Sequence, residues 1–516
     1  MKSNNFKLNL AKVITFTLIA FFLLYKLEFI PAGFFCDEAL IAIRTKELLS
    51  FDFKGFYDPF TYEHFGYVVG TLPIISLLPI IFFLGMSELS VRLGVMIFAF
   101  AALVVLYFIL KKLKDPLPIA SVIIFATTPV FLHFSRLNFG QTQSLFFILL
   151  GYYFFLKIEE NKTVKYSVLA AVAFGISGYG LGANVISTPL FVALLFFYHF
   201  FFIKNICRRQ FIIFLLVFIL MYLPFFHSFT TNPNFLNRIR AKDKLTNTRT
   251  LQSRIVDVIT NYPKYYSYDY LFLKGENNVP GAFIKRLSIN DVGILSKSSL
   301  PLLVLSIFFF LFFPLATKKE YLPFFSLFLL YPFPDIITTS SGSPPYTGAL
   351  YATLFWIPFM TSALFSALYK LLKTKLYLWR GGVTLMLIFT IVEAVLLLKA
   401  YDNYRIFSAD YWGWQSGPKE MVKYFLQVNK NYDEIYMTGM FNQPQIFLQF
   451  YDTKQQCFNC FIGGIDRYDS SKRQLFALTS EEYNNLTVDN FIIKKIIRYP
   501  DKSPAFILGE FTDTKP

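Results

Sequence analysis

The sequence predicts an all-α polytopic membrane protein, with about eleven transmembrane helices, outer juxtamembrane helices and a small C-terminal extracytoplasmic α/β domain. Three observations support this fold class. Hydrophobic residues make up 55% of the chain, and charged residues only 16%, well below the share found in soluble domains. The apolar runs are continuous rather than alternating, which indicates helices that satisfy their own backbone groups in lipid. Lys and Arg cluster between these runs, as they do in cytoplasmic loops.

A helix needs about 20 apolar residues to cross a bilayer. The predicted spans are 12–31, 91–110, 117–134, 139–157, 166–182, 184–203, 211–229, 299–316, 321–337, 350–370 and 382–399. A further apolar run, 67–85, contains Pro73 and Pro79, each of which removes a backbone donor. We expect this run to be re-entrant or to lie along the outer interface, because every basic cluster then falls on the cytoplasmic side.

This topology divides the chain into a transmembrane module, 1–399, and an extracytoplasmic domain, 400–516. The module carries two long outer loops, 32–90 and 230–298. The first apolar run follows several lysines and lacks a small-residue cleavage site, so we interpret it as an uncleaved anchor with a cytoplasmic N-terminus in the plasma (inner) membrane. In the tail, a helical pattern over 420–428 and short apolar runs separated by Asn and Pro predict the α/β domain.

The net charge of +16 does not indicate nucleic-acid binding here, because cytoplasmic loops account for the excess of Lys and Arg. The four cysteines are too few for a disulfide scaffold. Cys457 and Cys460 stand close together as CFNC, which fits a local disulfide or two free thiols and, alternatively, a redox or half-zinc site.

Asp37 and Glu38 follow the first predicted span directly, in FFCDEALIAIRTKELL. Ionisable groups at a membrane surface are costly and are often functional. The apolar residues after them predict an amphipathic helix able to lie in the interface. A carboxylate placed there can act as a general base or hold a divalent cation against a phosphate. It can also simply cap the helix or interact with its dipole, and spacing alone leaves these alternatives open.

Several segments resemble one family when they are taken in order. Asp37, Glu38 and Ala39 form a DEA motif after the first span, and SELSVRL at 87–93 opens the second. PVFLHFSRLNFGQTQSL, SGYGLGANVISTP, YDYLFLKGENNVPGAF, DEIYMTG and FLQFY extend the likeness over most of the chain. Together they are similar to the bacterial fold-C membrane glycosyltransferases of the protein O-mannosyltransferase and aminoarabinose-transferase-like group.

The resemblance assigns Asp37 the role of catalytic base, with Glu38 beside it. The residues that it implies for substrate or phosphate binding are Arg136, Glu63, His64 and Tyr179. No cofactor is required by the sequence; if a divalent cation takes part, Asp37 and Glu63 are its candidate ligands. The sequence departs from the family pattern at Gln141 and Gln143, where acidic residues are common, and at Asn184, where Arg is common.

The resemblance implies the inverting transfer of a sugar from a polyprenyl-phosphate donor to a lipid, glycan or protein acceptor on the outer face of the membrane. A cation, Arg136 or a basic residue of loop 230–298, would stabilise the departing phosphate. A polysaccharide polymerase or ligase is one alternative; it is expected to use Arg and His of that loop, which contains no His but has Arg238, Arg240, Arg249, Arg254 and Arg286. A lipid or glycan transporter, and a degenerate binding-only member of the same fold, are the others.

Overall fold

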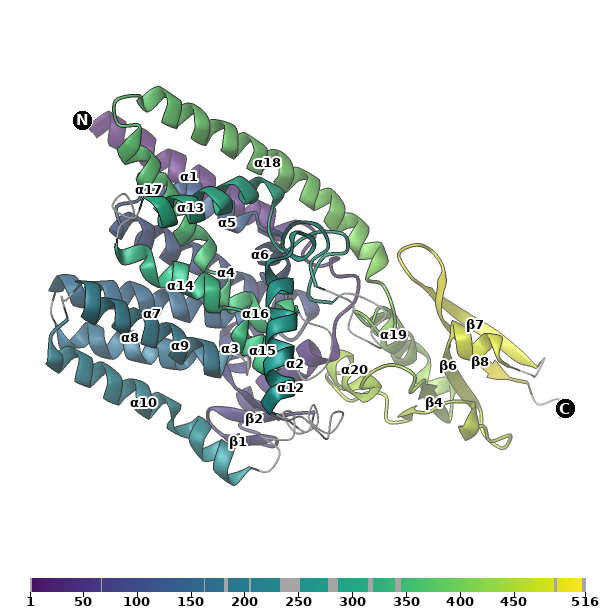
Figure 1. Ribbon diagram of the computed structural model, residues 1–516. Helices are drawn as coiled ribbons and strands as arrows, with labels where there is room; N and C mark the ends of the chain where they lie inside the picture. The colour runs from purple at the N-terminus through teal and green to yellow at the C-terminus, as the bar shows by residue number, and fades with distance from the viewer. Residues whose placement is uncertain are drawn as a thin grey trace.

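The computed structural model describes residues 2–65, 67–161, 163–180, 184–203, 206–232, 251–276, 286–313, 319–338, 345–486 and 490–512. Figure 1 shows a bundle of helices, with a small domain containing a β-sheet at one end. The bundle helices with their bounds are α1 (Lys2–Leu24), α4 (Glu88–Lys112), α5 (Pro118–Ala126), α6 (Pro129–Phe134), α7 (Gln141–Asn161), α8 (Val164–Ser177), α9 (Asn184–Tyr198), α10 (Arg208–Thr231), α13 (Leu300–Phe312), α14 (Leu322–Leu330), α15 (Phe333–Thr338), α16 (Thr347–Leu350), α17 (Trp356–Leu371) and α18 (Leu376–Phe407).

Five helical segments of the described chain are long and apolar enough to cross a membrane. They are Glu88–Lys112, Asn184–Phe202, Arg208–Ser228, Tyr351–Leu371 and Leu376–Phe407. Shorter apolar helices accompany them, so the fold is that of a membrane protein, whereas the total of about eleven spans stays a prediction. The predicted span 117–134 is interrupted between α5 and α6, because Pro129 removes a backbone donor and disfavours helical geometry in Thr128.

The expected re-entrant run contains helix α3 (Leu72–Leu84). Its 13 residues extend about 20 Å, which is less than the roughly 30 Å of a hydrocarbon core. Before it lies a three-stranded antiparallel sheet that the sequence did not predict: β1 (Phe56–Asp58), β2 (Thr61–His64) and β3 (Tyr67–Gly70). The segment predicted to be the first outer loop therefore contains helix α2 (Cys36–Leu49), this sheet and α3.

Helix α2 begins where predicted, but its apolar residues do not form a lipid-facing surface. Ala39, Leu40, Ala42 and Ile43 are all buried, and α2 packs on α3 and on helix α20 (Pro444–Tyr451) of the C-terminal domain. The expectation that this helix lies with its apolar face in the interface is therefore wrong. Protein, rather than lipid, covers that face.

The C-terminal domain contains a five-stranded mixed sheet, as the sequence indicated. The strand order is β5 (Cys460–Ile462), β4 (Glu434–Met437), β6 (Gln474–Thr479), β8 (Pro504–Phe511) and β7 (Phe491–Arg498). β4 pairs in parallel with β5 and β6, and the other neighbours are antiparallel. Helix α19 (Pro418–Val428) confirms the predicted helical pattern. Short helical segments η1 (His199–Ile203), η3 (Tyr262–Tyr266), η4 (Asp269–Leu273), η5 (Lys297–Ser299), η6 (Lys319–Tyr321), η7 (Tyr351–Thr353), η8 (Asn429–Asn431) and η9 (Ile465–Arg467), with α12 (Leu251–Asn261) and α21 (Ser480–Asn484), complete the described elements.

Figure 1 shows the N-terminus and the α17–α18 connection at one end of the bundle, and the C-terminal domain at the opposite end. Helix α18 has 32 residues, about 48 Å, so it is long enough to cross the hydrocarbon core and continue to the domain. The candidate residues of α2 and the small sheet lie at the domain end. Two lysine-rich segments, at the start of α1 and around the α17–α18 connection, lie at the other end.

Candidate functional site

The first turn of α2 directs two neighbouring carboxylates to different surroundings. Consecutive helix residues are about 100° apart around the axis, so adjacent side chains leave in different directions. The Asp37 side chain is 34% exposed. Glu38 is completely buried. Both lie in the first turn, where the helix dipole favours negative charge, but neither is the N-cap residue, which is Phe35.

Asp37 faces the small sheet. Its Oδ1 lies 3.4 Å from Nε2 of His64, and Nδ1 of His64 shares a hydrogen bond of 2.9 Å with the Tyr62 hydroxyl. Burial raises the pKa of Tyr62 well above its usual value, so this hydroxyl keeps its proton. When Tyr62 donates to Nδ1, the imidazole proton lies on Nε2 and faces the carboxylate. The chain Tyr62, His64, Asp37 can thus orient the carboxylate.

A thiol also contacts Asp37. The Cys36 Sγ donates to Asp37 Oδ1 over 3.7 Å, and burial raises the pKa of this thiol, so it stays protonated. The C-terminal domain and its linker hold Cys36 in turn: its backbone N–H donates to Gln415 Oε1 at 2.8 Å, and Asn442 Nδ2 contacts its sulfur at 3.5 Å. The position of Asp37 therefore depends on residues that are 379 and 406 positions from Cys36 in the chain.

Glu38 points into a polar cluster inside the bundle. Its Oε1 accepts a hydrogen bond of 3.0 Å from the backbone N–H of Asn138. Gln143 Nε2 donates to Asn138 Oδ1 at 2.9 Å and to Ser76 Oγ at 3.1 Å. Burial, opposed by the charge of Arg92, raises the pKa of Glu38 to about 7. Gln143, which replaces a common acidic residue of the family, therefore acts here as a buried amide that supports the Glu38 cluster.

The structure brings His64 to Asp37 but keeps Glu63 away from it. Successive residues of a strand point to opposite faces, and Tyr62 and His64 share the face toward Asp37. Glu63 is exposed on the other face. Within the described residues, no group of three or more His, Cys, Asp or Glu side chains could hold a metal ion. Asp37 and Glu63 consequently do not fit a shared divalent cation, and no step below passes through one.

Arg136 binds the backbone rather than an open site. Its guanidinium donates to the carbonyl oxygens of Leu23, Tyr25 and Ile30 over 2.8 to 3.3 Å, and the residue is fully buried. These acceptors belong to the last turn of α1 and the segment after it. Arg136 thereby satisfies carbonyls that a helix end leaves without partners. To make the predicted contact with a phosphate, the Arg136 guanidinium would have to break its hydrogen bonds to these carbonyls.

Arg92, of the SELSVRL motif, has the same kind of role. Its guanidinium donates to the carbonyls of Leu27, Glu28, Pro31 and Gly33 over 2.6 to 3.3 Å. The motif's first residues are also structural: the Ser87 hydroxyl caps α4, and Glu88 binds the Tyr451 hydroxyl and, at 3.3 Å, Lys419 of the C-terminal domain. This motif therefore anchors the segment before Asp37 and joins the bundle to the domain.

The structure identifies one cation near Asp37 that sequence reasoning named only within a group. The Arg286 guanidinium lies over the Phe35 ring, 3.8 Å from its centroid, and donates to the carbonyls of Trp412 and Gly413 at 3.3 Å. Arg286 is half-buried, and its charge counteracts the rise in the Cys36 pKa. Arg238, Arg240 and Arg249 of the same loop lie outside the described residues. No spacing in the sequence distinguishes Arg286, because its neighbours at the site come from distant segments.

Tyr179 contacts the Phe60 ring just before β2, with centroids 5.2 Å apart, whereas Asp37 meets His64 at the other end of that strand. The Tyr179 hydroxyl donates to the Met221 carbonyl at 2.6 Å, and its ring stacks on Phe225 with centroids 4.2 Å apart. Its own carbonyl accepts from Leu72 N–H at 3.1 Å. Tyr179 thus joins α10 to the start of α3. Its predicted contact with substrate stays a prediction, and residues 181–183 of the same motif lie outside the described residues.

Cys457 and Cys460 form a disulfide. Of the alternatives for CFNC, the structure therefore supports the local disulfide. Cys460 begins β5, and the Asp452 carboxylate accepts from the N–H groups of Gln456 and Cys457 at 2.9 Å each. The disulfide closes this turn at the edge of the sheet.

Comparisons with known proteins agree with this architecture. The family model described as dolichyl-phosphate-mannose-protein mannosyltransferase matches residues 73–227. The crystal structure of ArnT from Cupriavidus metallidurans in the apo state aligns over 98% of this chain and 99% of its own, with a TM-score of 0.54 and 11% identity. The same protein bound to undecaprenyl phosphate gives a TM-score of 0.52 at 10% identity, over 98% and 99% of the two chains.

The archaeal oligosaccharyltransferase AglB from Archaeoglobus fulgidus, in complex with an inhibitory peptide and a dolichol-phosphate, aligns with a TM-score of 0.51 and 14% identity. This alignment covers 86% of the present chain and 63% of AglB. The chain has the fold of ArnT and AglB. The resemblance to fold-C membrane glycosyltransferases, predicted from short motifs, is thereby confirmed at the level of fold. No curated protein sequence matches the chain.

Proposed function

We propose that this protein is a glycosyltransferase that transfers a sugar from a polyprenyl phosphate to an acceptor hydroxyl, with inversion at the sugar carbon, on the outer face of the plasma membrane. The observation that carries the proposal is the placement of Asp37: a one-third exposed carboxylate at the start of a juxtamembrane helix, oriented by His64 and within a fold shared with ArnT. Support for the donor class comes from the undecaprenyl phosphate and dolichol-phosphate bound to the two similar proteins.

Asp37 is the general base of the proposed reaction. Its carboxylate accepts the proton of the acceptor hydroxyl while that oxygen forms a bond to the anomeric carbon of the sugar. The bond from this carbon to the phosphate oxygen breaks on the opposite face, and the configuration is inverted. His64 contacts the carboxylate, and Tyr62 holds the ring of His64. These two residues position the base.

The leaving phosphate departs as an anion and therefore needs positive charge rather than a general acid. We assign this role to Arg286 in preference to Arg136, because Arg286 is half-buried on Phe35 directly before Cys36 and Asp37. Both guanidinium groups donate to backbone carbonyls, but Arg136 is completely buried and donates to three of them, whereas the half-buried Arg286 donates to two. Planar guanidinium groups match phosphate oxygens well.

We propose a boundary between two modules at residue 399, and both modules contribute to the surroundings of Asp37. The transmembrane module, 1–399, supplies the base, and the extracytoplasmic domain, 400–516, closes over the first turn of α2 through Gln415 and Asn442. Lipid, glycan and protein all offer hydroxyl acceptors. A catalytic role for Glu38 is less well supported, because its carboxylate is completely buried.

The test is a transfer assay in membranes with a panel of polyprenyl-phosphate sugars, comparing wild type, Asp37→Asn and Asp402→Asn. Asp402 is the matched control: its side chain is also 34% exposed, but it belongs to α18 and pairs with Lys26, just after the end of α1. Loss of a general base is expected to lower turnover about a hundredfold to ten-thousandfold in Asp37→Asn only. Equal turnover in wild type and Asp37→Asn would remove the proposed base. Donor binding without turnover in wild type would instead support a binding-only member of the fold.

A further inference from the structure

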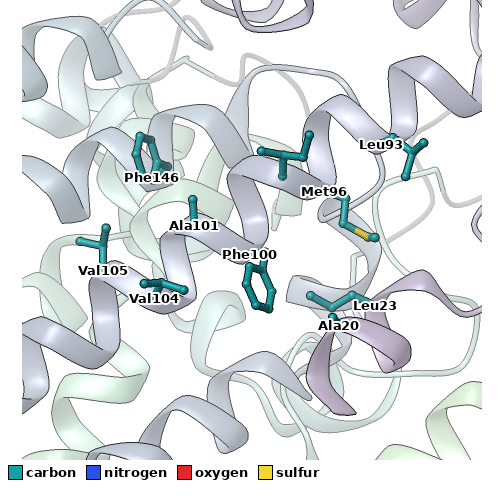
Figure 2. Close-up of a pocket in the computed structure, with 10 residues that line it drawn as sticks. Ala20, Leu23, Leu93, Met96, Phe100, Ala101, Val104, Val105 and Phe146 are labelled. Carbon is teal, nitrogen blue, oxygen red and sulfur yellow. The ribbon is translucent and has the colours of Figure 1, made fainter. Parts of the chain in front are cut away.

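A long apolar groove runs between α1 and α4. It consists of two adjoining cavities of about 510 and 520 Å³, which share the lining residues Ala20, Phe100 and Val104. Figure 2 shows the first of them, with Phe100, Val104 and Phe146 on one side and Ala20 and Leu23 on the other. The two helices are antiparallel here, since Leu23 and Leu93 line one end whereas Lys12 and Phe108 line the other.

The α4 side of the groove is a continuous stripe. Its lining residues recur every three or four positions from Leu93 through Ile97, Phe100 and Val104 to Phe108, the spacing of one helix face. This stripe covers about 22 Å along the axis, most of the thickness of a hydrocarbon core. A groove of this length and composition fits an extended hydrocarbon chain.

Lysine side chains lie at the end of the groove that Lys12 and Phe108 line. Lys12 lines the groove there, and its ammonium donates one hydrogen bond to Asn9 at 3.2 Å. Lys111 continues the α4 stripe one turn beyond Phe108 and is exposed. Lys112 points elsewhere, because it pairs with Glu160. An ammonium group carries three donors, so Lys12 has capacity for a phosphate oxygen as well as Asn9.

This charged end lies opposite the candidate site. The groove follows α1 (Lys2–Leu24) from Lys12 to Leu24, and α2, with Asp37, comes after the Leu24 end. At that other end the nearby arginines, Arg92 and Arg136, have their guanidinium groups on backbone carbonyls. A sugar donor must bring its phosphate to Asp37, so a lipid whose phosphate lies at Lys12 is a different molecule.

We propose that the α1–α4 groove binds an anionic glycerophospholipid, with an acyl chain along the apolar stripe and the phosphate between Lys12 and Lys111. Basic pockets between transmembrane helices select anionic head groups in this way. The lipid fills the space beside the first half of α1, where Phe16 contacts the Phe100 and Tyr107 rings across the groove. It thereby stabilises α1 at the end that the two buried arginines do not reach. This inference is independent of the proposed transfer reaction.

The experiment is native mass spectrometry of the full-length protein in neutral detergent, with phosphatidylglycerol and phosphatidylcholine of the same acyl chains. We expect wild type to retain phosphatidylglycerol in preference. Each lysine contributes about a fivefold preference for an anionic head group. The ratio of retained phosphatidylglycerol to retained phosphatidylcholine is therefore expected to fall about 25-fold in the Lys12→Gln/Lys111→Gln variant. Ala101→Phe, which places a ring in the groove, is expected to reduce retention of both lipids.

The matched control is Lys373→Gln/Lys375→Gln, which removes the same charge from two exposed lysines of the α17–α18 connection. It should retain phosphatidylglycerol like wild type. Equal retention of the two lipids by wild type, or equal losses in both double variants, would overturn the proposal. So would displacement of the bound phosphatidylglycerol by stoichiometric undecaprenyl phosphate, because the groove would then be a polyprenyl site.

Discussion

The two sides of the first turn of α2 differ in what surrounds an acidic residue. On the side of Glu38, the surrounding groups include the buried backbone of Asn138, the buried amide of Gln143 behind it, and the charge of the buried Arg92. On the side of Asp37, the neighbours are His64 of the small sheet and the thiol of Cys36, and a third of the side chain is open. Two residues that are adjacent in the sequence thus have separate environments.

This difference teaches that a motif can combine a structural and a reactive residue. On the buried side Glu38 binds the backbone of Asn138, whereas on the open side the Asp37 carboxylate is one-third exposed, as the proposed role of a base requires. The same division applies to the arginines. Arg92 and Arg136 hold the chain between α1 and α2 through backbone carbonyls, and Arg286 stacks beside the open side. The following predictions test this division, in order of decreasing effect.

Arg136→Met should give the largest loss of stability, because it leaves the carbonyls of Leu23, Tyr25 and Ile30 buried without a donor. A buried acceptor left without its hydrogen bond costs about 1–3 kcal/mol, and three carbonyls lose their donor here. The measurement is the apparent melting temperature of the purified protein in detergent. Arg380→Met, at an exposed arginine of α18, is the control and should melt like wild type. If Arg136→Met were as stable as wild type but no longer bound the sugar donor, Arg136 would be a substrate-binding residue rather than a structural one.

Glu38→Gln should change how stability depends on pH. The folded-state pKa of Glu38 is raised from 4.5 to about 7, so the folded protein binds this proton more tightly than the unfolded chain does. Its stabilisation is therefore complete below pH 4.5 and is lost as the pH rises through about 7, a loss of about 3 kcal/mol. Melting temperatures measured from pH 5 to pH 8 should fall in wild type and fall less in Glu38→Gln. Parallel curves would contradict the burial of this carboxyl.

Arg286→Gln should reduce transfer, with a loss of stability of about 2 kcal/mol from the two hydrogen bonds to the Trp412 and Gly413 carbonyls. The loss of a charged contact to phosphate costs about 1.5–3 kcal/mol, or about tenfold to a hundredfold in kcat/KM. Arg405→Gln is a matched control, because Arg405 is also half-buried with its guanidinium near an aromatic ring, that of Phe29. If Arg405→Gln reduced kcat/KM as much, the effect would not be specific to the site of Asp37.

Tyr179→Phe should have the smallest effect. It removes the hydrogen bond from the hydroxyl to the Met221 carbonyl but keeps the stacking on Phe225. We expect a loss of about 1 kcal/mol in stability and unchanged transfer. Measurements of the melting temperature and of kcat/KM for Tyr179→Phe and wild type test this prediction. A fall in kcat/KM at unchanged melting temperature would restore the predicted substrate contact.

Several features were predictable from the sequence because they depend on local composition. Continuous apolar runs predicted the helical bundle, and the polar tail with its short apolar runs predicted the α/β domain. The motif around Asp37 and Glu38 predicted the start of α2. The total number of spans was less accessible, because proline divides apolar runs such as that of α5 and α6 without changing their hydropathy.

The arrangement of the site depended on contacts between distant segments. Asp37 meets His64 only because β2 pairs within a three-stranded sheet, and it is held by Gln415 and Asn442 through Cys36. Which acceptors surround an arginine depends on the fold: Arg136 donates to carbonyls at the end of α1, whereas Arg286 lies on the Phe35 ring beside Cys36. The sequence by itself determined the class of protein and the residues that could react, because hydrophobicity and residue type are local properties. Only the tertiary structure decided which of them are open and which are buried, because burial is created by segments far apart in the chain.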